Sequence, residues 1–154
     1  MAAALGTSDR MLIHYFGSKD VLIERVLELA RPNVEALVAD HGGDIRSLAH
    51  AIWHELSQGG PQQPRVRVLL EVMTLALTRS DQYGEFARTS VSRWIEPLSE
   101  ALRRGGQNED DASARATAIV SGLRGIAVDR FITGERARTD RSAHLLIDSV
   151  LGTR

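Results

Sequence analysis

The sequence contains no cysteine, so it has neither a disulfide framework nor thiolate chemistry. It also contains no secretory apolar segment and no run of 18 apolar residues. From these absences we expect a cytoplasmic protein that has no membrane partner.

A surplus of basic charge is missing as well. The formal net charge is −1, and Lys19 is the only lysine of the chain. Residues 1–28 carry three basic and four acidic side chains. This is not the balance of a protein that coats nucleic acid, so any binding to DNA has to depend on geometry rather than on bulk charge.

Alternation of polar and apolar residues, the mark of a half-buried strand, does not occur. Apolar residues instead recur at helical spacing, and they make up 43% of the 154 residues, which is enough for a single core. We therefore expect an all-α fold. The predicted helices span about residues 18–40, 44–56, 65–79, 80–104, 110–133 and 141–151.

Glycine and proline separate or bend these helices. Gly105 and Gly134 are expected to end helices, whereas Pro32 and Pro97 lie inside apolar patterns and are expected to bend them. The helix at 65–79 has apolar residues on nearly every side, which predicts a helix buried in the middle of the domain.

The first twenty residues are the most informative part of the chain. Gly6 suits a tight turn, and Thr7 or Ser8 can cap a short helix that ends at Phe16. Ser18 then caps the next, longer helix. A short helix between two turns that presents polar and aromatic side chains has the form of a recognition helix in a helix-turn-helix unit.

This segment resembles the DNA-binding signature of the TetR family of transcriptional regulators. Thr7 replaces the usual valine, and Ile13 replaces a tyrosine that the family often places on a DNA phosphate. The resemblance is confined to the N-terminal segment, and the rest of the chain agrees with the family only in its helical architecture. The matching positions are Gly6, Ser8, Leu12, Tyr15, Phe16, Ser18, Lys19, Asp20 and Leu22.

The resemblance implies a DNA-contacting face on the short helix. Arg10 can read a guanine edge, and His14 can reach a base or a phosphate. Tyr15 and Lys19 fit phosphate contacts. The alternative is a solvated turn between two core helices. The predicted DNA-binding residues are Asp9, Arg10, Met11, His14, Tyr15 and Lys19.

Family members carry a first helix and most of a second before the glycine of the turn. Only Met1–Leu5 precede Gly6 here, so we expect either a start assigned too late or a truncated product. The predicted domains are 1–20, a remnant of the helix-turn-helix, and 21–154, a ligand-binding and dimerisation domain. Without its supporting helices, the recognition helix of this chain is expected to bind DNA weakly or not at all.

Large apolar side chains on successive helices are either plain core or the walls of an effector cavity, which the resemblance places in this region. The expected cavity is largely apolar and holds roughly 300–1,000 Å³. His50 and His54, spaced i, i+4, fit either a shared metal or a polar pocket wall, and no third ligand is evident. The predicted ligand-binding residues are Trp53, His54, Met73, Phe86, Trp94 and Arg124.

The last two helices carry more apolar surface than one inner face needs, and Gly122 and Gly125 keep the first of them thin. The resemblance implies that these helices pair with those of a second copy in a four-helix interface, whereas the alternative is packing within one chain. The predicted interface residues are Ile119, Leu123, Ile126, Leu146 and Val150.

The expected function is that of a dimeric transcriptional regulator, a repressor released from operator DNA by a small molecule. It needs no cofactor or metal, and no catalytic arrangement such as a nucleophile elbow occurs, so an enzyme is not expected. One alternative is a helical small-molecule-binding or interaction dimer without DNA binding.

Overall fold

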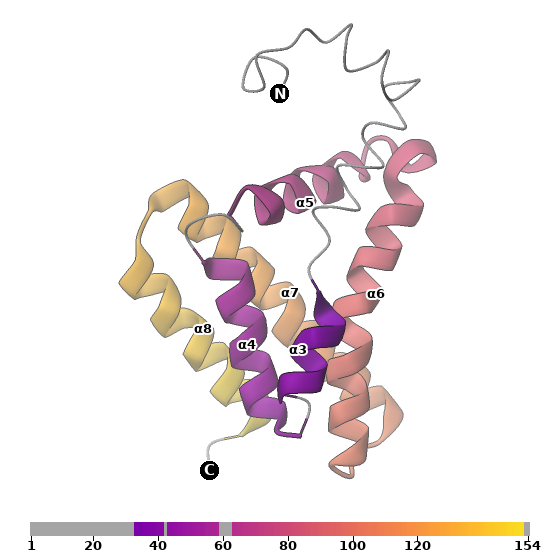
Figure 1. The fold of residues 1–154 in the computed structure, drawn as a ribbon, viewed down its shortest axis with the longest axis vertical. Coiled ribbons are helices and arrows are strands. Elements are labelled where there is room, and N and C mark those ends of the chain that lie inside the picture. Colours follow the sequence, from indigo (N-terminus) through magenta and orange to yellow (C-terminus); the bar gives the residue numbers. More distant parts are fainter. Residues whose placement is uncertain (1–32, 42, 59–62, 153–154) are drawn as a thin grey trace, which may run out of the picture. The chain divides into compact units, whose positions relative to one another are not determined.

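The computed structural model describes residues 33–41, 43–58 and 63–152. Within this part the fold is all-α, as predicted, and no strand occurs in it. The helices, drawn in Figure 1, are α3 (Val34–His41), α4 (Ile45–Ser57), α5 (Gln63–Leu75), α6 (Ser80–Arg104), α7 (Glu109–Thr133) and α8 (Arg136–Leu151). The six predicted DNA-binding residues, Pro32 and the boundary between the two predicted domains lie outside the described residues.

Local sequence signals set several helix ends where they were expected. The Asp44 side chain accepts a hydrogen bond from the Arg46 backbone N–H, so it caps α4. Gly134 ends α7 with a φ of 74°, a left-handed conformation that glycine adopts without steric cost. The break between α6 and α7 falls at Gly105, also as predicted.

The last helix begins earlier than its apolar pattern suggests. It was expected from Arg141, but α8 starts at Arg136. Residues 136–140 contain a single apolar side chain, so periodicity gives no signal there. Thr139 is fully buried in this first turn, and its hydroxyl donates to the Glu135 carbonyl at 2.8 Å. Polar contacts therefore extend the helix.

The core lies between α4, α6, α7 and α8, and α7 packs along both α6 and α8 (Figure 1). Trp94 and Leu98 of α6 and Leu48 of α4 are among its fully buried side chains. Ile119 and Leu123 of α7 belong to the same core and have no exposed surface. Because both side chains are fully buried within one chain, neither can contact a second copy. This burial corrects their prediction as interface residues.

Helix α5 is not buried on all sides, contrary to the expectation for residues 65–79. Val66, Leu69 and Val72 are buried, but Arg67 and Glu71 on the opposite side are exposed. The helix also ends at Leu75, and turns continue the chain to α6. Helix α5 therefore covers the core with one face.

Among the described helices, none combines the length and the apolar character that a membrane-spanning helix requires.

Candidate functional site

A cavity of about 540 Å³ lies where the end of α4 meets the corner between α7 and α8. This volume lies within the range of small-molecule sites. Two of the predicted ligand-binding residues, Trp53 and His54, line it. The lining residues are His50, Trp53, His54, Ser57, Gln58, Arg130, Arg136, Asp140 and His144.

One wall is held by a contact between Trp53, Arg130 and Asp140. The Trp53 indole Nε1 donates to Asp140 Oδ1 at 3.0 Å, and Arg130 Nη1 donates to the same oxygen at 2.6 Å. The Arg130 guanidinium also lies over the Trp53 ring, 5.6 Å from its centre. Three helices thereby meet at a single carboxylate, which fixes the shape of this wall.

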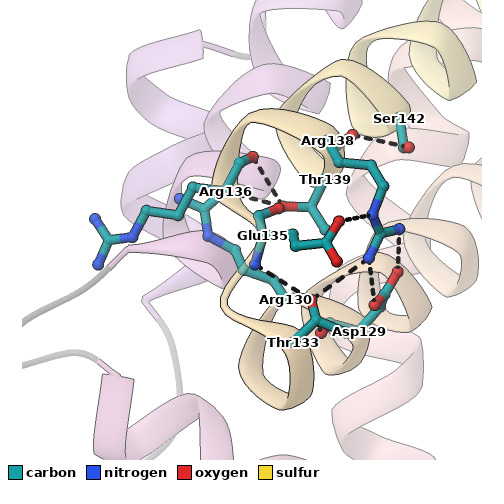
Figure 2. A network of polar contacts seen from close by, with 8 residues as sticks. All are labelled: Asp129, Arg130, Thr133, Glu135, Arg136, Arg138, Thr139 and Ser142. Carbon is teal, nitrogen blue, oxygen red and sulfur yellow. Dashed lines mark hydrogen bonds and ion pairs between the residues drawn. The ribbon is translucent and has the colours of Figure 1, made fainter.

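The corner between α7 and α8 is held by a second set of ion pairs, shown in Figure 2. Arg138 donates to both carboxylate oxygens of Asp129, at 2.6 and 2.8 Å, and also pairs with Glu135. These hydrogen bonds hold the pKa of Asp129 below its usual range. The bidentate pair keeps the first turn of α8 in place, and with it the residues that α8 contributes to the cavity.

The other wall is formed by two histidines from different helices. The rings of His50 on α4 and His144 on α8 meet edge to face, with centroids 5.0 Å apart. Burial lowers the pKa of His50, and the neighbouring His144 lowers it further. Both effects favour the neutral imidazole, which has one donor nitrogen and one acceptor nitrogen.

Arg136 completes the cavity at the first position of α8. Its side chain extends away from the ion pairs of the corner in Figure 2. Among the described residues, no side chain pairs with its guanidinium, and the residue is exposed. The cavity thus contains one arginine in an ion pair, Arg130, and one, Arg136, that has no partner among the described side chains.

The other predicted ligand-binding residues do not line this cavity. Trp94 lies in the core with 1% of its surface exposed, and Met73 and Phe86 are half-buried on α5 and α6. Arg124 is buried between α7 and α6, where its Nη2 donates to the Ser90 carbonyl at 3.1 Å. The structure therefore separates the six residues into a cavity pair, a core tryptophan, a buried arginine and two residues of the α5–α6 region.

A second, apolar groove of about 500 Å³ runs between α5 and the end of α7. The effector cavity was expected between three middle helices and the penultimate one, but only one middle helix, α5, lines this groove, and none of the predicted ligand-binding residues lies in its walls. Arg67 lies over the Phe131 ring at one edge, 5.4 Å from the ring centre. The groove is lined by Arg67, Leu70, Glu71, Thr74, Leu75, Val128, Phe131 and Ile132.

Sequence reasoning missed six residues of the polar cavity, namely Ser57, Gln58, Arg130, Arg136, Asp140 and His144. Ser57 and Gln58 lie at the end of α4, Arg130 lies in the last turn of α7, and the other three lie in α8. None of the six belongs to a motif. The only available signal was the density of charge in residues 129–141. The approach of the α8 residues to Trp53 depends on the packing of α8 against α4, which is a tertiary contact.

The contact at Asp140 yields a testable prediction. The Asp140→Ala variant leaves the Arg130 guanidinium and the Trp53 indole N–H without their acceptor, so we expect the free energy of unfolding to fall by about 2–3 kcal/mol. Urea denaturation followed by circular dichroism measures the change. The Asp140→Asn variant keeps an acceptor oxygen and should lose less, and equal losses in the two variants would contradict this role of the oxygen.

No group of three or more histidine, aspartate and glutamate side chains suited to a metal ion occurs in residues 33–41, 43–58 and 63–152. No known protein family, characterised protein or solved structure matches this chain.

Proposed function

We propose that the protein is a ligand-responsive transcriptional regulator, a repressor, that binds operator DNA as a dimer. The observation that carries the proposal is the pattern of residues 6–22, which resembles the TetR signature at nine positions. The all-α fold and the cavity between α4, α7 and α8 support it. In this mechanism, a ligand favours one conformation of the helical domain over another and so shifts the population of dimers that fit the operator.

The cavity is placed where a ligand can act on the packing of three helices. Residues of α4, α7 and α8 line it, and the Asp140 carboxylate of α8 accepts hydrogen bonds from Trp53 of α4 and Arg130 of α7. A ligand that binds one arrangement of these helices about 100-fold more tightly than the other shifts their equilibrium by about 2.7 kcal/mol. A shift of this size changes the ratio of the two arrangements from about 1:10 to about 10:1.

Dimerisation is supported by an exposed stripe along α7. Its residues follow one another at intervals of four and three, the spacing of a seam between two packed helices. All of them are small or apolar, and none is charged. Near the end of the stripe Ile132 is 78% exposed, and Leu145 on the neighbouring α8 is 58% exposed. The stripe consists of Ala114, Ala118, Ser121, Gly125, Val128 and Ile132.

The Ser121→Arg variant tests this stripe. A guanidinium at its centre would be buried without a partner when two copies pair, so we expect the dimer dissociation constant to rise about 100-fold or more. Analytical ultracentrifugation over a range of concentrations measures it. The matched control is Ser113→Arg, the same change on an exposed part of α7 away from the stripe. A monomeric wild-type protein, or equal weakening in both variants, would contradict the proposal.

DNA binding is tested with the full-length protein, including any residues encoded in frame before Met1. Duplexes selected from a random library on the immobilised protein are titrated by fluorescence polarisation. We expect binding that weakens as salt rises, with a preference for a two-fold symmetric site. Failure to select any sequence, or binding to every duplex alike, would contradict the regulator.

The net charge of −1 favours one second candidate, a small-molecule-binding or interaction dimer that does not bind DNA. The two candidates share the helical domain and differ only at the N-terminal segment. Selective DNA binding that the Arg10→Ala variant abolishes, with an unchanged dimer, would decide for the regulator.

A further inference from the structure

We propose that the cavity between α4, α7 and α8 binds the acid group of a small organic anion, a carboxylate or a phosphate ester, with Arg136 as its main charged contact. This inference rests on the proposed function only in so far as the anion would be the effector. Binding itself is independent of DNA.

The charge of the cavity is the first argument. Two arginines line it, and Asp140 is the only acid among the lining residues described. That carboxylate is already engaged, because Arg130 and Trp53 both donate to its Oδ1. Arg136 is left with a guanidinium that no described side chain pairs with, so the cavity carries one uncompensated positive charge. A guanidinium binds a carboxylate or a phosphate through two parallel hydrogen bonds.

The neighbours of Arg136 are the second argument. His50, His54 and His144 bring three imidazoles to the same cavity, and Ser57 and Gln58 add a hydroxyl and an amide. The rings of His50 and His144 can each donate a hydrogen bond to an oxyanion. The Ser57 hydroxyl already donates to the His54 carbonyl, and Gln58 Nε2 already lies against the His54 ring, so His54 and Gln58 offer only the N–H groups that this contact leaves free. Arg136 also stands in the first turn of the sixteen-residue helix α8, where the helix dipole favours a negative charge.

The size and the apolar part of the cavity define the rest of the ligand. A volume of about 540 Å³ exceeds what an inorganic ion needs and suits a small organic molecule. Trp53 is 4% exposed, and its ring forms part of the wall. A small organic acid whose apolar or aromatic body lies against the Trp53 ring therefore fits the cavity. The hydrogen bonds of Arg138 with Asp129 hold the neighbouring corner of α7 and α8.

Three probes of similar shape test the proposal on the full chain in the absence of DNA. Benzoate carries a carboxylate, phenyl phosphate carries a phosphate ester, and benzamide is the neutral counterpart of benzoate. By isothermal titration calorimetry we expect at least one of the two anions to bind about tenfold or more tightly than benzamide. The preferred anion identifies the acid group. Equal affinity for all three, or no binding of either anion, would overturn the proposal.

Two arginine variants of α8 test the contact itself. Arg136→Gln is expected to weaken binding of the preferred anion about tenfold or more. Arg141→Gln removes the same charge from an exposed position of the same helix outside the cavity, and it should leave the affinity unchanged. Both residues are exposed, so both variants should fold. An equal loss of affinity in the two variants would show that the anion responds to the overall charge of the protein, and it would overturn the assignment of Arg136 as the contact.

Nuclear magnetic resonance locates the bound anion. The protein has two tryptophans, and Trp53 lines the cavity while Trp94 lies in the core. Addition of the preferred anion should shift the indole N–H resonance of Trp53 and leave that of Trp94 in place. A shift of the Trp94 resonance alone would show that the anion binds outside this cavity, and it would overturn the proposal. If the anion binds at Trp53 but does not alter DNA binding, the site stands and its regulatory role fails.

Discussion

The Arg124→Met variant is expected to be more stable than the wild-type protein. Arg124 is 7% exposed, and its only hydrogen-bond partner in the described chain is the Ser90 carbonyl. Within the part of the chain that the structure describes, its Nε is buried without a hydrogen-bond partner, and no carboxylate forms an ion pair with the guanidinium. Burial lowers the pKa of the guanidinium to about 10, which reports how poorly this site accommodates a positive charge.

The size of the effect follows from that cost. Methionine is unbranched like the arginine stem and carries no charge, and replacement of buried charged groups by apolar ones has stabilised proteins by roughly 1–4 kcal/mol. Its side chain is three heavy atoms smaller, and the space it leaves offsets part of that gain. Ser90 lies within α6, where its carbonyl takes part in the helical hydrogen bonds in any case. We therefore expect a gain of about 1–3 kcal/mol in the free energy of unfolding, and roughly 2–4 °C in Tm for each kcal/mol in a chain of this size.

Thermal and urea denaturation of the purified protein measure the gain. Arg141→Met is the control, because it removes an exposed arginine and should change the stability by no more than about 0.5 kcal/mol. A loss of stability in Arg124→Met, with Arg141→Met unchanged, would show that Arg124 has a compensating interaction that its contact with Ser90 does not explain.

The helices were predictable where the chain carries local signals. Asp44 caps α4, and Gly134 takes the left-handed conformation after α7, since both effects act within a few residues. The start of α8 was not predictable from periodicity. Its first turn is held by Thr139 and by the contacts of Arg138 with Asp129, which lie on the polar side of the helix.

The burial of helix faces was predictable only in part. The apolar residues of α5 suggested a helix surrounded by the core, but Arg67 and Glu71 are exposed and show which face points outward. For α7, periodicity identified Ile119 and Leu123 as apolar positions but not the partner that they face. An apolar pattern reports that a face is buried, and the identity of the covering helix depends on the tertiary fold.

The polar cavity shows the same limit. Trp53 and His54 were selected from α4 alone, and the structure places both at the cavity. Asp140 and Arg136 carry no signal of their own, because their role exists only after α8 packs against α4. Trp94 was an equally strong candidate by size, and the structure assigns it to the core instead.

That assignment leads to the largest destabilisation that we expect from one substitution. Trp94 is 1% exposed and belongs to the same buried cluster as Leu98 and Ile119. The Trp94→Ala variant removes the indole from the interior, so we expect the free energy of unfolding to fall by about 3–5 kcal/mol. Domains of this kind are stable by only about 5–15 kcal/mol, so the substitution removes roughly a fifth of that stability or more.

Two further variants separate a core tryptophan from a cavity tryptophan. Trp94→Phe keeps an aromatic ring in the core and should lose clearly less stability than Trp94→Ala, and it should leave the affinity for the preferred anion unchanged. Trp53→Phe removes the donor to Asp140 at the cavity and should alter that affinity. Urea denaturation and calorimetry on the same samples measure both properties. A loss of less than about 1 kcal/mol in Trp94→Ala would contradict the placement of Trp94 in a close-packed core. In such a core, removal of an indole leaves a large cavity, and that cavity lowers the free energy of unfolding by more than this.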